Sequence, residues 1–339
     1  MQRMTLGKTG IQVTRLGFGG IPIQRVSESQ AVETVLHALG RGVDFIDTAR
    51  AYTNSEHRIG LALREMDAGQ RVVLASKSRS RSADGIRRDI DTGLKELQRD
   101  RIDLYQCHFV KDRQDYQEIV SAGGALEGLL KARAEGLIGH IGLTTHSLDL
   151  VEPMLADDLF ETLMVCFSFL EPAAAERAFP AARRKNWGII AMKAFSGGVL
   201  DSAATALKFV FSHPDILVIP GVESPQLFEE NWKVFEGNWD LSTGELAQIE
   251  KTRKQYDKTF CRRCDYCQPC SEEIPIQIIL GMRYAVKRFG QNFLKQDWVE
   301  TAIEKARSCS ACGECLERCP YNLPIPDLIA DNLQWLDKR

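Results

Sequence analysis

The first 260 residues of this 339-residue sequence are nearly free of cysteine: only Cys107 and Cys166 occur there, although the chain has 10 cysteines in total. No apolar stretch approaches the roughly 20 residues that a membrane-spanning helix needs. The N-terminal segment MQRMTLGKTGIQVTRLGFGG also has no apolar signal core. We therefore expect a cytoplasmic protein without a membrane partner. Structural disulfides are rare in that reducing compartment.

An excess of basic residues is missing as well. The chain has 43 Lys and Arg against 46 Asp and Glu, which gives a formal net charge of −3. Proteins that bind DNA or RNA gain affinity by placing Lys and Arg on the phosphates and displacing counterions. We therefore expect no nucleic-acid partner, and the remaining composition is that of an ordinary globular protein.

Short apolar runs alternate with amphipathic segments through the first 255 residues. Apolar residues at three- and four-residue spacing predict helices at 27–42, 82–98 and 123–136. Such alternation is typical of parallel strands joined by crossover helices, and eight such units close into a (β/α)8 barrel of about 250 residues. The expected strands are residues 13–20, 43–49, 72–78, 102–109, 138–145, 162–169, 187–195 and 216–222. A doubly wound open sheet is the alternative, but no GxGxxG follows a strand.

Four polar residues follow three consecutive predicted strands, where barrel enzymes place their chemistry. Asp47, Lys77 and His108 end otherwise apolar runs, and Tyr52 lies in the loop after Asp47. A tyrosine donates a proton readily only when a nearby cation helps it to ionise. Lys77 can supply that cation, Asp47 can hold the lysine, and His108 can donate a hydrogen bond to a carbonyl oxygen. The pattern indicates a general acid suited to hydride transfer.

The sequence resembles the aldo-keto reductases over residues 4–240. The segments that carry the resemblance are LGKTGIQVTRLGFGG, GVDFIDTARAYTNSE, LASKS, RIDLYQCH, IGHIGLTTHS and IPGVESPQLFEEN, in the order and spacing of that family. The resemblance implies that Asp47, Tyr52, Lys77 and His108 form the catalytic tetrad, with Tyr52 as proton donor. It further implies a small carbonyl or alcohol substrate.

The resemblance also implies a nicotinamide cofactor, NAD(H) or NADP(H). The positions that would contact the nicotinamide carry Thr144 and Thr145 after the fifth strand and Met192 at the end of the seventh, followed by Lys193, a candidate for a cofactor phosphate. The segment IPGVESPQLFEEN corresponds to the adenosine end of the site. It contributes Gly221, Glu223, Glu230 and Asn231. Because it has no Arg or Lys for a 2′-phosphate, it favours NADH.

The other eight cysteines form two runs after residue 260. CSACGECLERCP has the C-x2-C-x2-C-x3-C-P spacing of bacterial ferredoxins that bind [4Fe–4S] clusters. CRRCDYCQPC is one residue shorter before its last cysteine. Zinc is the competing interpretation, because C-x2-C pairs also bind zinc. Two triplets, each with a trailing cysteine, suit two four-iron clusters better than two tetrahedral ions.

This change in composition predicts two domains, a barrel over 1–255 and an iron–sulfur domain over 256–339. Between the runs, residues 274–290 and 296–308 have helical periodicity, which predicts a small, mainly α-helical ferredoxin-like domain. The chain is similar to a subgroup of bacterial and archaeal aldo-keto reductases with such a tail. By resemblance to two-cluster modules, the expected ligand sets are Cys261, Cys264 and Cys267 with Cys319, and Cys309, Cys312 and Cys315 with Cys270.

Three functions remain compatible with these features. In the first, the barrel acts on a carbonyl or alcohol, and the clusters exchange electrons with a ferredoxin or another carrier. In the second, the protein is an NAD(P)H-dependent reductase whose clusters only brace the tail. In the third, the barrel is a docking scaffold and the protein is an electron-transfer subunit. A flavin is the usual link between hydride and single-electron transfer. The sequence has no flavin motif, but it does not exclude a flavin.

Overall fold

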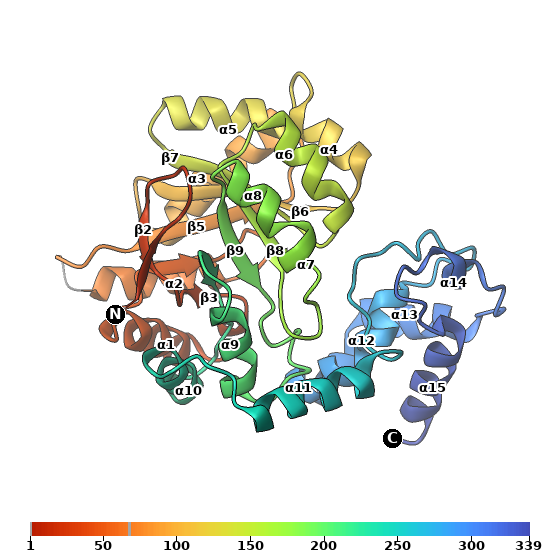
Figure 1. Cartoon of the computed structure of the whole chain (residues 1–339). Helices are drawn as coiled ribbons and strands as arrows, with labels where there is room; N and C mark the ends of the chain where they lie inside the picture. The colour runs from red at the N-terminus through yellow and green to blue at the C-terminus, as the bar shows by residue number, and fades with distance from the viewer. Residues whose placement is uncertain (1, 67–68) are drawn as a thin grey trace. The chain divides into compact units, whose positions relative to one another are not determined.

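The computed structural model describes residues 2–66 and 69–339, and the chain folds as two compact units (Figure 1). Unit 1 comprises Met1–Ser196 and Leu200–Leu241, and unit 2 comprises Gly197–Val199 and Ser242–Arg339. Composition predicts a boundary near residue 255, whereas the contacts divide the chain before α11 (Thr243–Tyr256). The helix α11 has no cysteine, so the change in composition comes after it.

Unit 1 contains a parallel sheet of eight strands that pair in chain order. Bridges between Leu16 and Val218 and between Gly19 and Gly221 join the first and last strands, so the sheet closes on itself. The fold is thus the expected α/β class with a (β/α)8-type barrel. Its strands are β3 (Phe18–Gly19), β4 (Phe45–Asp47), β5 (Val73–Ser78), β6 (Ile102–Val110), β7 (Ile138–Thr145), β8 (Thr162–Cys166), β9 (Gly188–Met192) and β10 (Ile216–Val218).

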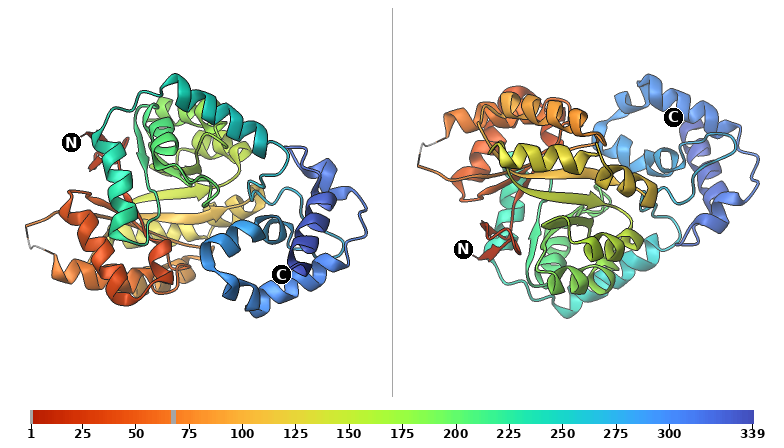
Figure 2. Two further views of the ribbon diagram at one scale, coloured as in Figure 1. Left: turned by 90° about the horizontal axis from the view of Figure 1, so that it is seen from below. Right: turned by 90° about the horizontal axis from the view of Figure 1, so that it is seen from above.

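Helices follow the strands and surround the sheet (Figure 2). The predicted helices at 27–42, 82–98 and 123–136 are confirmed as α1 (Glu28–Gly40), α3 (Ala83–Leu97) and α5 (Ala125–Ala134). Ser27 and Ser82 cap the first two by accepting backbone N–H groups. The other helical segments of unit 1 are η1 (Pro22–Arg25), α2 (Ser55–Glu65), α4 (Arg113–Val120), η2 (Leu148–Leu150), α6 (Val151–Asp157), α7 (Ala174–Arg177), α8 (Phe179–Arg184), α9 (Ala203–Phe211) and α10 (Pro225–Glu236).

The strands bury both faces, because alternate residues enter two separate cores. One core fills the barrel and includes Phe45, Ala75, Leu104, Met164 and Ile190. The other lies between the strands and the helices and includes their sequence neighbours, such as Ile46, Leu74 and Val165. The alternation therefore determines which residues at each strand end point into the mouth of the barrel.

The structure corrects the prediction of one strand over residues 13–20. This segment is divided between β3 and β2 (Gln12–Thr14), and β2 pairs antiparallel with β1 (Arg3–Thr5). Apolar residues of this hairpin, including Met4 and Val13, join the core inside the barrel. The hairpin therefore closes the end of the barrel at which the strands begin, and the barrel strand itself starts only after it.

Unit 2 is helical, as its sequence predicts. Its helical segments are α11, α12 (Ile276–Phe289), η3 (Gln291–Lys295), α13 (Asp297–Arg307), α14 (Glu314–Arg318) and α15 (Ile325–Asp337). The helices predicted at 274–290 and 296–308 are confirmed as α12 and α13, and both pack against α15. Buried Cys267 and Cys319 belong to the small apolar core that these helices share. Among the described residues, no helix is both long and apolar enough to cross a membrane.

Candidate active site and cysteine pockets

Three residues of the predicted tetrad lie at the ends of neighbouring strands β4, β5 and β6 and face the barrel interior. Asp47 pairs in register with Ala75, which lies in the interior core. Lys77 follows Ala75 by two residues on the same face, and it pairs with Gln106. His108 follows Gln106 by two residues. Because side chains alternate along a strand, all three point toward the same end of the barrel.

Lys77 and Asp47 form a buried ion pair. Lys77 Nζ donates to Asp47 Oδ2 at 2.6 Å and to the carbonyl oxygen of Thr48 at 2.8 Å, and both charged side chains are almost fully buried. Burial alone would lower the pKa of Lys77, but Asp47 and Tyr52 raise it above its ordinary value. Lys77 therefore remains a cation. Gln106, which sequence reasoning missed, donates to Asp47 Oδ1 at 3.4 Å.

Tyr52, in the loop between β4 and α2, completes the predicted tetrad. Lys77 Nζ lies 4.9 Å from the centre of the Tyr52 ring, and the ring meets that of His108 edge-on at a centroid distance of 5.8 Å. Burial raises the pKa of Tyr52, whereas the positive charge of Lys77 lowers it. The structure thus brings all four predicted residues together, and the cation opposes the effect of burial on the phenol.

The imidazole of His108 is uncharged. Burial, reinforced by the nearby positive charges of Lys77, Arg79, Arg81 and Lys193, lowers the pKa of His108 to about 2. A neutral imidazole can donate one N–H to a carbonyl oxygen without transferring the proton. Among the described residues, Nδ1 of His108 is buried without a hydrogen-bond partner.

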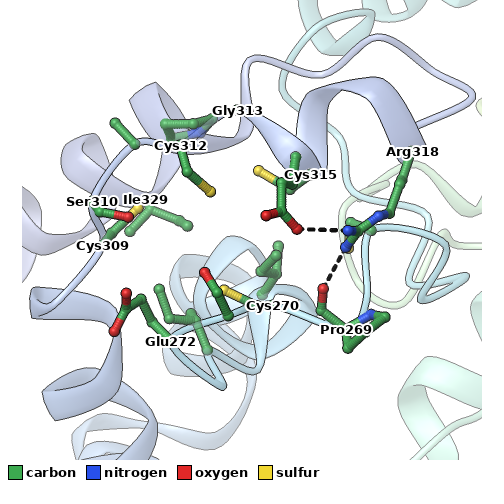
Figure 3. Close-up of a pocket in the computed structure, with 17 residues that line it drawn as sticks. Pro269, Cys270, Glu272, Cys309, Ser310, Cys312, Gly313, Cys315, Arg318 and Ile329 are labelled. Carbon is green, nitrogen blue, oxygen red and sulfur yellow. Dashed lines mark hydrogen bonds and ion pairs between the residues drawn. The ribbon is translucent and has the colours of Figure 1, made fainter.

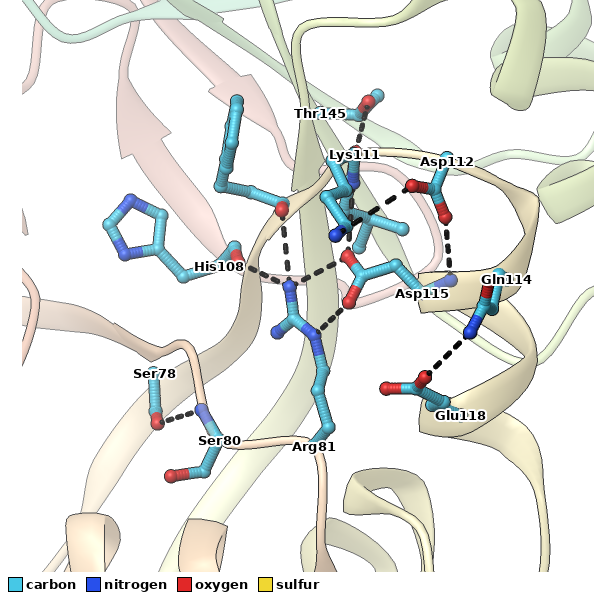
Figure 4. Close-up of polar contacts among 12 residues, drawn as sticks. Ser78, Ser80, Arg81, His108, Lys111, Asp112, Gln114, Asp115, Glu118 and Thr145 are labelled. Atoms are coloured by element: carbon cyan, nitrogen blue, oxygen red, sulfur yellow. Dashed lines mark hydrogen bonds and ion pairs between the residues drawn. The ribbon is translucent and has the colours of Figure 1, made fainter. Parts of the chain in front are cut away.

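A bulge in β6 sets the backbone at His108. The pairing of β6 with β7 shifts between Cys107 and Val110, and Phe109 has a left-handed φ of 56°. Arg81 Nη2 donates to the carbonyl oxygens of His108 at 3.0 Å and of Phe109 at 3.1 Å (Figure 4). Asp115 in turn binds Arg81 through both carboxylate oxygens. Sequence reasoning missed this contact, because no local pattern connects Arg81 with the bulge.

The two threonines predicted near the nicotinamide face opposite sides of β7. Thr144 pairs with Met164 of the interior core, whereas Thr145 pairs with Val165 of the outer core. Thr145 Oγ1 is buried and donates to the carbonyl oxygen of Val110 at 2.7 Å. Only Thr144 therefore faces the barrel mouth, and its hydroxyl accepts the N–H of Phe109 at 2.8 Å. Met192 is half-buried at the edge of the interior core.

The remaining predicted cofactor residues lie after β9 and β10. Lys193 Nζ is 3.1 Å from Nε2 of His146. Gly221 is exposed in the loop before α10, Glu230 is an exposed residue of that helix, and Asn231 is buried. Glu223 forms an ion pair with Arg25 of η1 at 2.7 Å. The segment IPGVESPQLFEEN has no cation of its own, which favours NADH, but the fold brings Arg25 to it.

In unit 2, the two cysteine runs line two separate pockets. One pocket is lined by Cys261, Cys264 and Cys267 together with Cys319 from the second run. The other is lined by Cys309, Cys312 and Cys315 together with Cys270 from the first run, and also by Cys267. Figure 3 shows the sulfur atoms of Cys270, Cys312 and Cys315 directed into the second pocket. Each pocket therefore combines three closely spaced cysteines of one run with the last cysteine of the other.

All ten cysteines are free thiols. Cys107 and Cys166 are buried in unit 1, and burial raises the pKa of Cys107 to about 12, as expected for a packing residue. Within residues 2–66 and 69–339, no three His, Cys, Asp or Glu side chains are grouped to hold a single metal ion. A [4Fe–4S] cluster is larger than one metal ion, so its cysteine ligands surround a cavity and do not converge on a single point.

The sequence profile of the Aldo/keto reductase family matches residues 15–205, which includes all four tetrad positions. The chain belongs to this family. Related proteins of the family are oxidoreductases, typically NAD(P)H-dependent. The family match thus agrees with the convergence of Asp47, Tyr52, Lys77 and His108 at one end of the barrel.

Curated relatives are similar to somewhat more than half of the chain. L-galactose dehydrogenase of Arabidopsis thaliana is 29% identical in an alignment 215 residues long that covers 58% of this chain and 66% of that protein. The NADH-specific methylglyoxal reductase of Escherichia coli is 25% identical in an alignment 233 residues long that covers 60% of this chain and 71% of that protein. The chain thus spans about two thirds of the length of these relatives.

Solved structures confirm the fold of the barrel. The holo form of the aldo-keto reductase AKR11C1 from Bacillus halodurans has a TM-score of 0.64 at 21% identity, covering 74% of this chain and 96% of that one. An aldo/keto reductase from Klebsiella pneumoniae, solved with NADP and acetate, has a TM-score of 0.62 at 22% identity, covering 75% and 96%. At these identities the likeness concerns the fold alone.

Proposed function

We propose that this protein is an iron–sulfur oxidoreductase that interconverts a small carbonyl compound and its alcohol with NADH or NADPH. The observation that carries the proposal is the convergence of Tyr52, Lys77 and His108 at one end of the barrel, beside the buried carboxylate of Asp47. Family membership supports the reaction class. The proposed substrate is a small aldehyde or ketone, because Tyr52 and His108 both form hydrogen bonds with a carbonyl oxygen in the proposed mechanism.

In the direction of reduction, Tyr52 donates the phenolic proton to the carbonyl oxygen. Lys77 stabilises the phenolate that remains, and Asp47 keeps the lysine charged and in place. Neutral His108 donates an N–H to the same carbonyl oxygen and orients it toward Tyr52. When bound, the nicotinamide supplies the hydride that reaches the carbonyl carbon. The product is the alcohol, and water returns a proton to Tyr52.

The residues around the mouth suit a dinucleotide. Thr144 and Met192 are the polar and apolar groups that face the interior at the ends of β7 and β9. Lys193 and Arg25 supply cations in the loops after β9 and β3, and the N-terminus of α10 adds backbone N–H groups after β10. Barrel enzymes commonly bind phosphate after their seventh and eighth strands, at such a helix N-terminus. Lys193 and the helix N-terminus suit the diphosphate of a nicotinamide cofactor, and Arg25 suits the 2′-phosphate of NADPH.

We further propose that unit 2 holds two [4Fe–4S] clusters. The support is the chemistry of the two pockets: each is lined by the four thiols that the resemblance to two-cluster modules implies, and Cys267 also borders the second pocket. Thiolate is the ligand that four-iron clusters require. Burial raises the pKa of Cys264 to about 11 and that of Cys267 to about 12. Such thiols become thiolates only when a positively charged group such as iron binds them.

The clusters would carry single electrons, so we propose that they exchange electrons with a ferredoxin or a similar external carrier. Free thiols and oxygen-sensitive clusters agree with the cytoplasmic location proposed from the sequence. A flavin that links hydride and single-electron transfer is compatible with this scheme. In the competing function, an electron-transfer subunit, the barrel would bind no nicotinamide and only unit 2 would be active.

Anoxic purification followed by metal analysis and spectroscopy tests both parts. We expect about eight iron and eight acid-labile sulfides per chain, and bleaching of the broad iron–sulfur absorption when NADH or NADPH is added. Stoichiometric zinc with little iron would contradict the cluster proposal. Iron without bleaching, but with NAD(P)H-dependent reduction of aldehydes, would make the clusters structural. Iron without any nicotinamide binding by calorimetry would support the electron-transfer subunit.

A further inference from the structure

We propose that Arg81 and Asp115 are positioning residues: they clamp the bulged backbone of β6 and thereby fix the direction of the His108 imidazole. The inference rests on the proposed function, in which His108 orients the substrate carbonyl. It adds two residues outside the tetrad, neither of which needs to touch substrate or cofactor.

The bulge creates backbone groups that the sheet cannot satisfy. Cys107 pairs with Leu143 and Val110 with Thr145, so two residues of β6 stand opposite Thr144 alone. Thr144 Oγ1 accepts the Phe109 N–H. The carbonyl oxygens of the two bulged residues remain, and Nη2 of Arg81 donates to both. Because one of its two N–H groups goes to Asp115, the two carbonyls share the other. A bulge can redirect a side chain, and His108 is one of the two residues of this bulge.

Asp115 holds the guanidinium in place. Its two carboxylate oxygens accept Arg81 Nε at 2.6 Å and Nη2 at 2.9 Å, a bidentate pair of low exposure. Oδ2 of Asp115 also accepts the N–H of Lys111, just after the bulge. Asp112 caps α4 by accepting the N–H of Asp115. The clamp therefore connects the start of α3, the end of β6 and the first turn of α4 (Figure 4).

This arrangement is poorly suited to stability alone. Within the described part of the chain, Arg81 Nη1 is buried without a hydrogen-bond partner, and an unsatisfied buried donor destabilises the folded state. Buried ion pairs are often no more stabilising than apolar side chains of similar volume. A guanidinium is nevertheless the group that can donate to two carbonyls and a carboxylate at fixed angles. The geometry of the bulge therefore explains the presence of Arg81 better than a contribution to folding stability does.

The positive charge of Arg81 helps to keep His108 neutral, while its hydrogen bonds hold the backbone of that residue. The groups that lower the pKa of His108, besides burial, are Lys77 of β5, Arg79 and Arg81 after β5, and Lys193 after β9. The uncharged ring that the proposed mechanism needs therefore depends partly on the clamp.

The test compares Arg81→Met and Arg81→Lys with Arg15→Met. Arg15 is the matched control, because it is also a buried arginine that donates to backbone carbonyls, those of Phe211, His213 and Ile216, at the opposite end of the barrel. With 4-nitrobenzaldehyde and NADPH, we expect Arg81→Met to lower kcat by about 10- to 100-fold, the cost of misplacing a catalytic group by about 1 Å. The Kd for NADPH should change little. Arg81→Lys keeps the charge but not the forked geometry, and should recover only part of kcat.

Arg15→Met should lower the Tm while leaving kcat per folded molecule near that of the wild type. A kcat of Arg81→Met equal to that of Arg15→Met would overturn the proposal.

Histidine NMR provides a readout that does not depend on turnover. In the wild type, the His108 signals, assigned with a His108→Asn variant, should not titrate between about pH 5 and pH 8, because the ring stays neutral. In Arg81→Met, the released bulge should admit water, and the pKa of His108 should rise toward about 6.5. Unchanged His108 signals in the folded variant would refute the clamp. If the wild type reduces no carbonyl, the proposed function fails, yet this comparison still decides whether Arg81 positions His108.

Discussion

Replacing Tyr52 by phenylalanine separates the chemistry of the site from its packing. The change removes one hydroxyl and leaves the ring, so the edge-on contact with His108 and the approach of Lys77 to the ring face are retained. Without the proton donor, turnover of an aldehyde should fall by about 10²–10⁴-fold, the usual contribution of general acid catalysis. This corresponds to roughly 2.7–5.5 kcal/mol of transition-state stabilisation.

Stability should change little in this variant, because the hydroxyl lies at the barrel mouth and not in its core. The assay is steady-state reduction of a panel of aldehydes and ketones with NADH and NADPH, with Tm and iron content measured on the same preparation. Full activity in a folded Tyr52→Phe protein with intact iron content would show that the tetrad does not act as proposed.

Removing Lys77 tests a different part of the same reasoning. Lys77→Met leaves Asp47 as an unpaired carboxylate in the protein interior, which typically costs about 3–5 kcal/mol and lowers Tm by on the order of 10 °C in a domain of this size. The double variant Asp47→Asn/Lys77→Met removes both charges and should recover most of the Tm. It should not recover activity, because the cation that stabilises the Tyr52 phenolate is still absent.

The pH profile of the residual activity of the double variant shows whether Lys77 lowers or raises the pKa of Tyr52. Reduction requires protonated Tyr52, so its rate falls as the pH rises through the pKa of that phenol. Burial raises this pKa, Lys77 lowers it, and the negative charge of Asp47 raises it by less than Lys77 lowers it. Without Lys77 the descending limb should therefore move to higher pH. A limb that stays in place, or moves to lower pH, would mean that Lys77 does not control the ionisation of Tyr52.

Three further predictions concern the cysteines, the cofactor and the barrel packing. Cys270→Ser and Cys319→Ser should each lower the iron content from about eight to about four per chain, because each residue lines the pocket of the other run; unchanged iron in both variants would contradict the shared ligand sets. Arg25→Met should weaken NADPH binding by about tenfold and NADH binding much less, as one charge-assisted hydrogen bond contributes about 1.5–3 kcal/mol; calorimetry that shows equal weakening would exclude Arg25 from the 2′-phosphate site. Gly60→Ala should destabilise unit 1 by about 1–3 kcal/mol, because its Cβ would clash with a backbone carbonyl of α3. Gly40→Ala, with no atom within 4 Å of the new Cβ, should leave the Tm equal or higher.

Periodicity in the sequence was sufficient to predict most of the barrel. Buried parallel strands are continuous apolar runs and the helices between them are amphipathic, so both patterns are local. The exception was the first strand. Residues 12–14 have the same apolar and polar alternation as a barrel strand, but they pair with Arg3–Thr5 to close one end of the barrel. Only the antiparallel partner distinguishes the two, and that partner lies outside the predicted strand.

The tetrad was predictable for a related reason. Each of its strand residues is a polar side chain that ends an apolar run, so its position at the barrel mouth can be derived from alternation and fold class together. Thr144 and Thr145 show the limit of this reasoning. Both end the same run, yet they face opposite sides of β7, and the register with β8 decides which one reaches the mouth. A shift of one residue would have exchanged them.

What the sequence could not reveal are contacts between polar groups that lie on different elements. Arg25 and Glu223 are 198 positions apart in the chain, and their ion pair changes the electrostatics of a segment that has no cation of its own. Arg81 and His108 are separated by 27 positions and meet at the bulge in β6. Neither arginine interrupts a periodic pattern, so neither is conspicuous. A tetrad is thus visible as an irregularity in local patterns, whereas Arg25 and Arg81 resemble ordinary surface charges until the chain is folded.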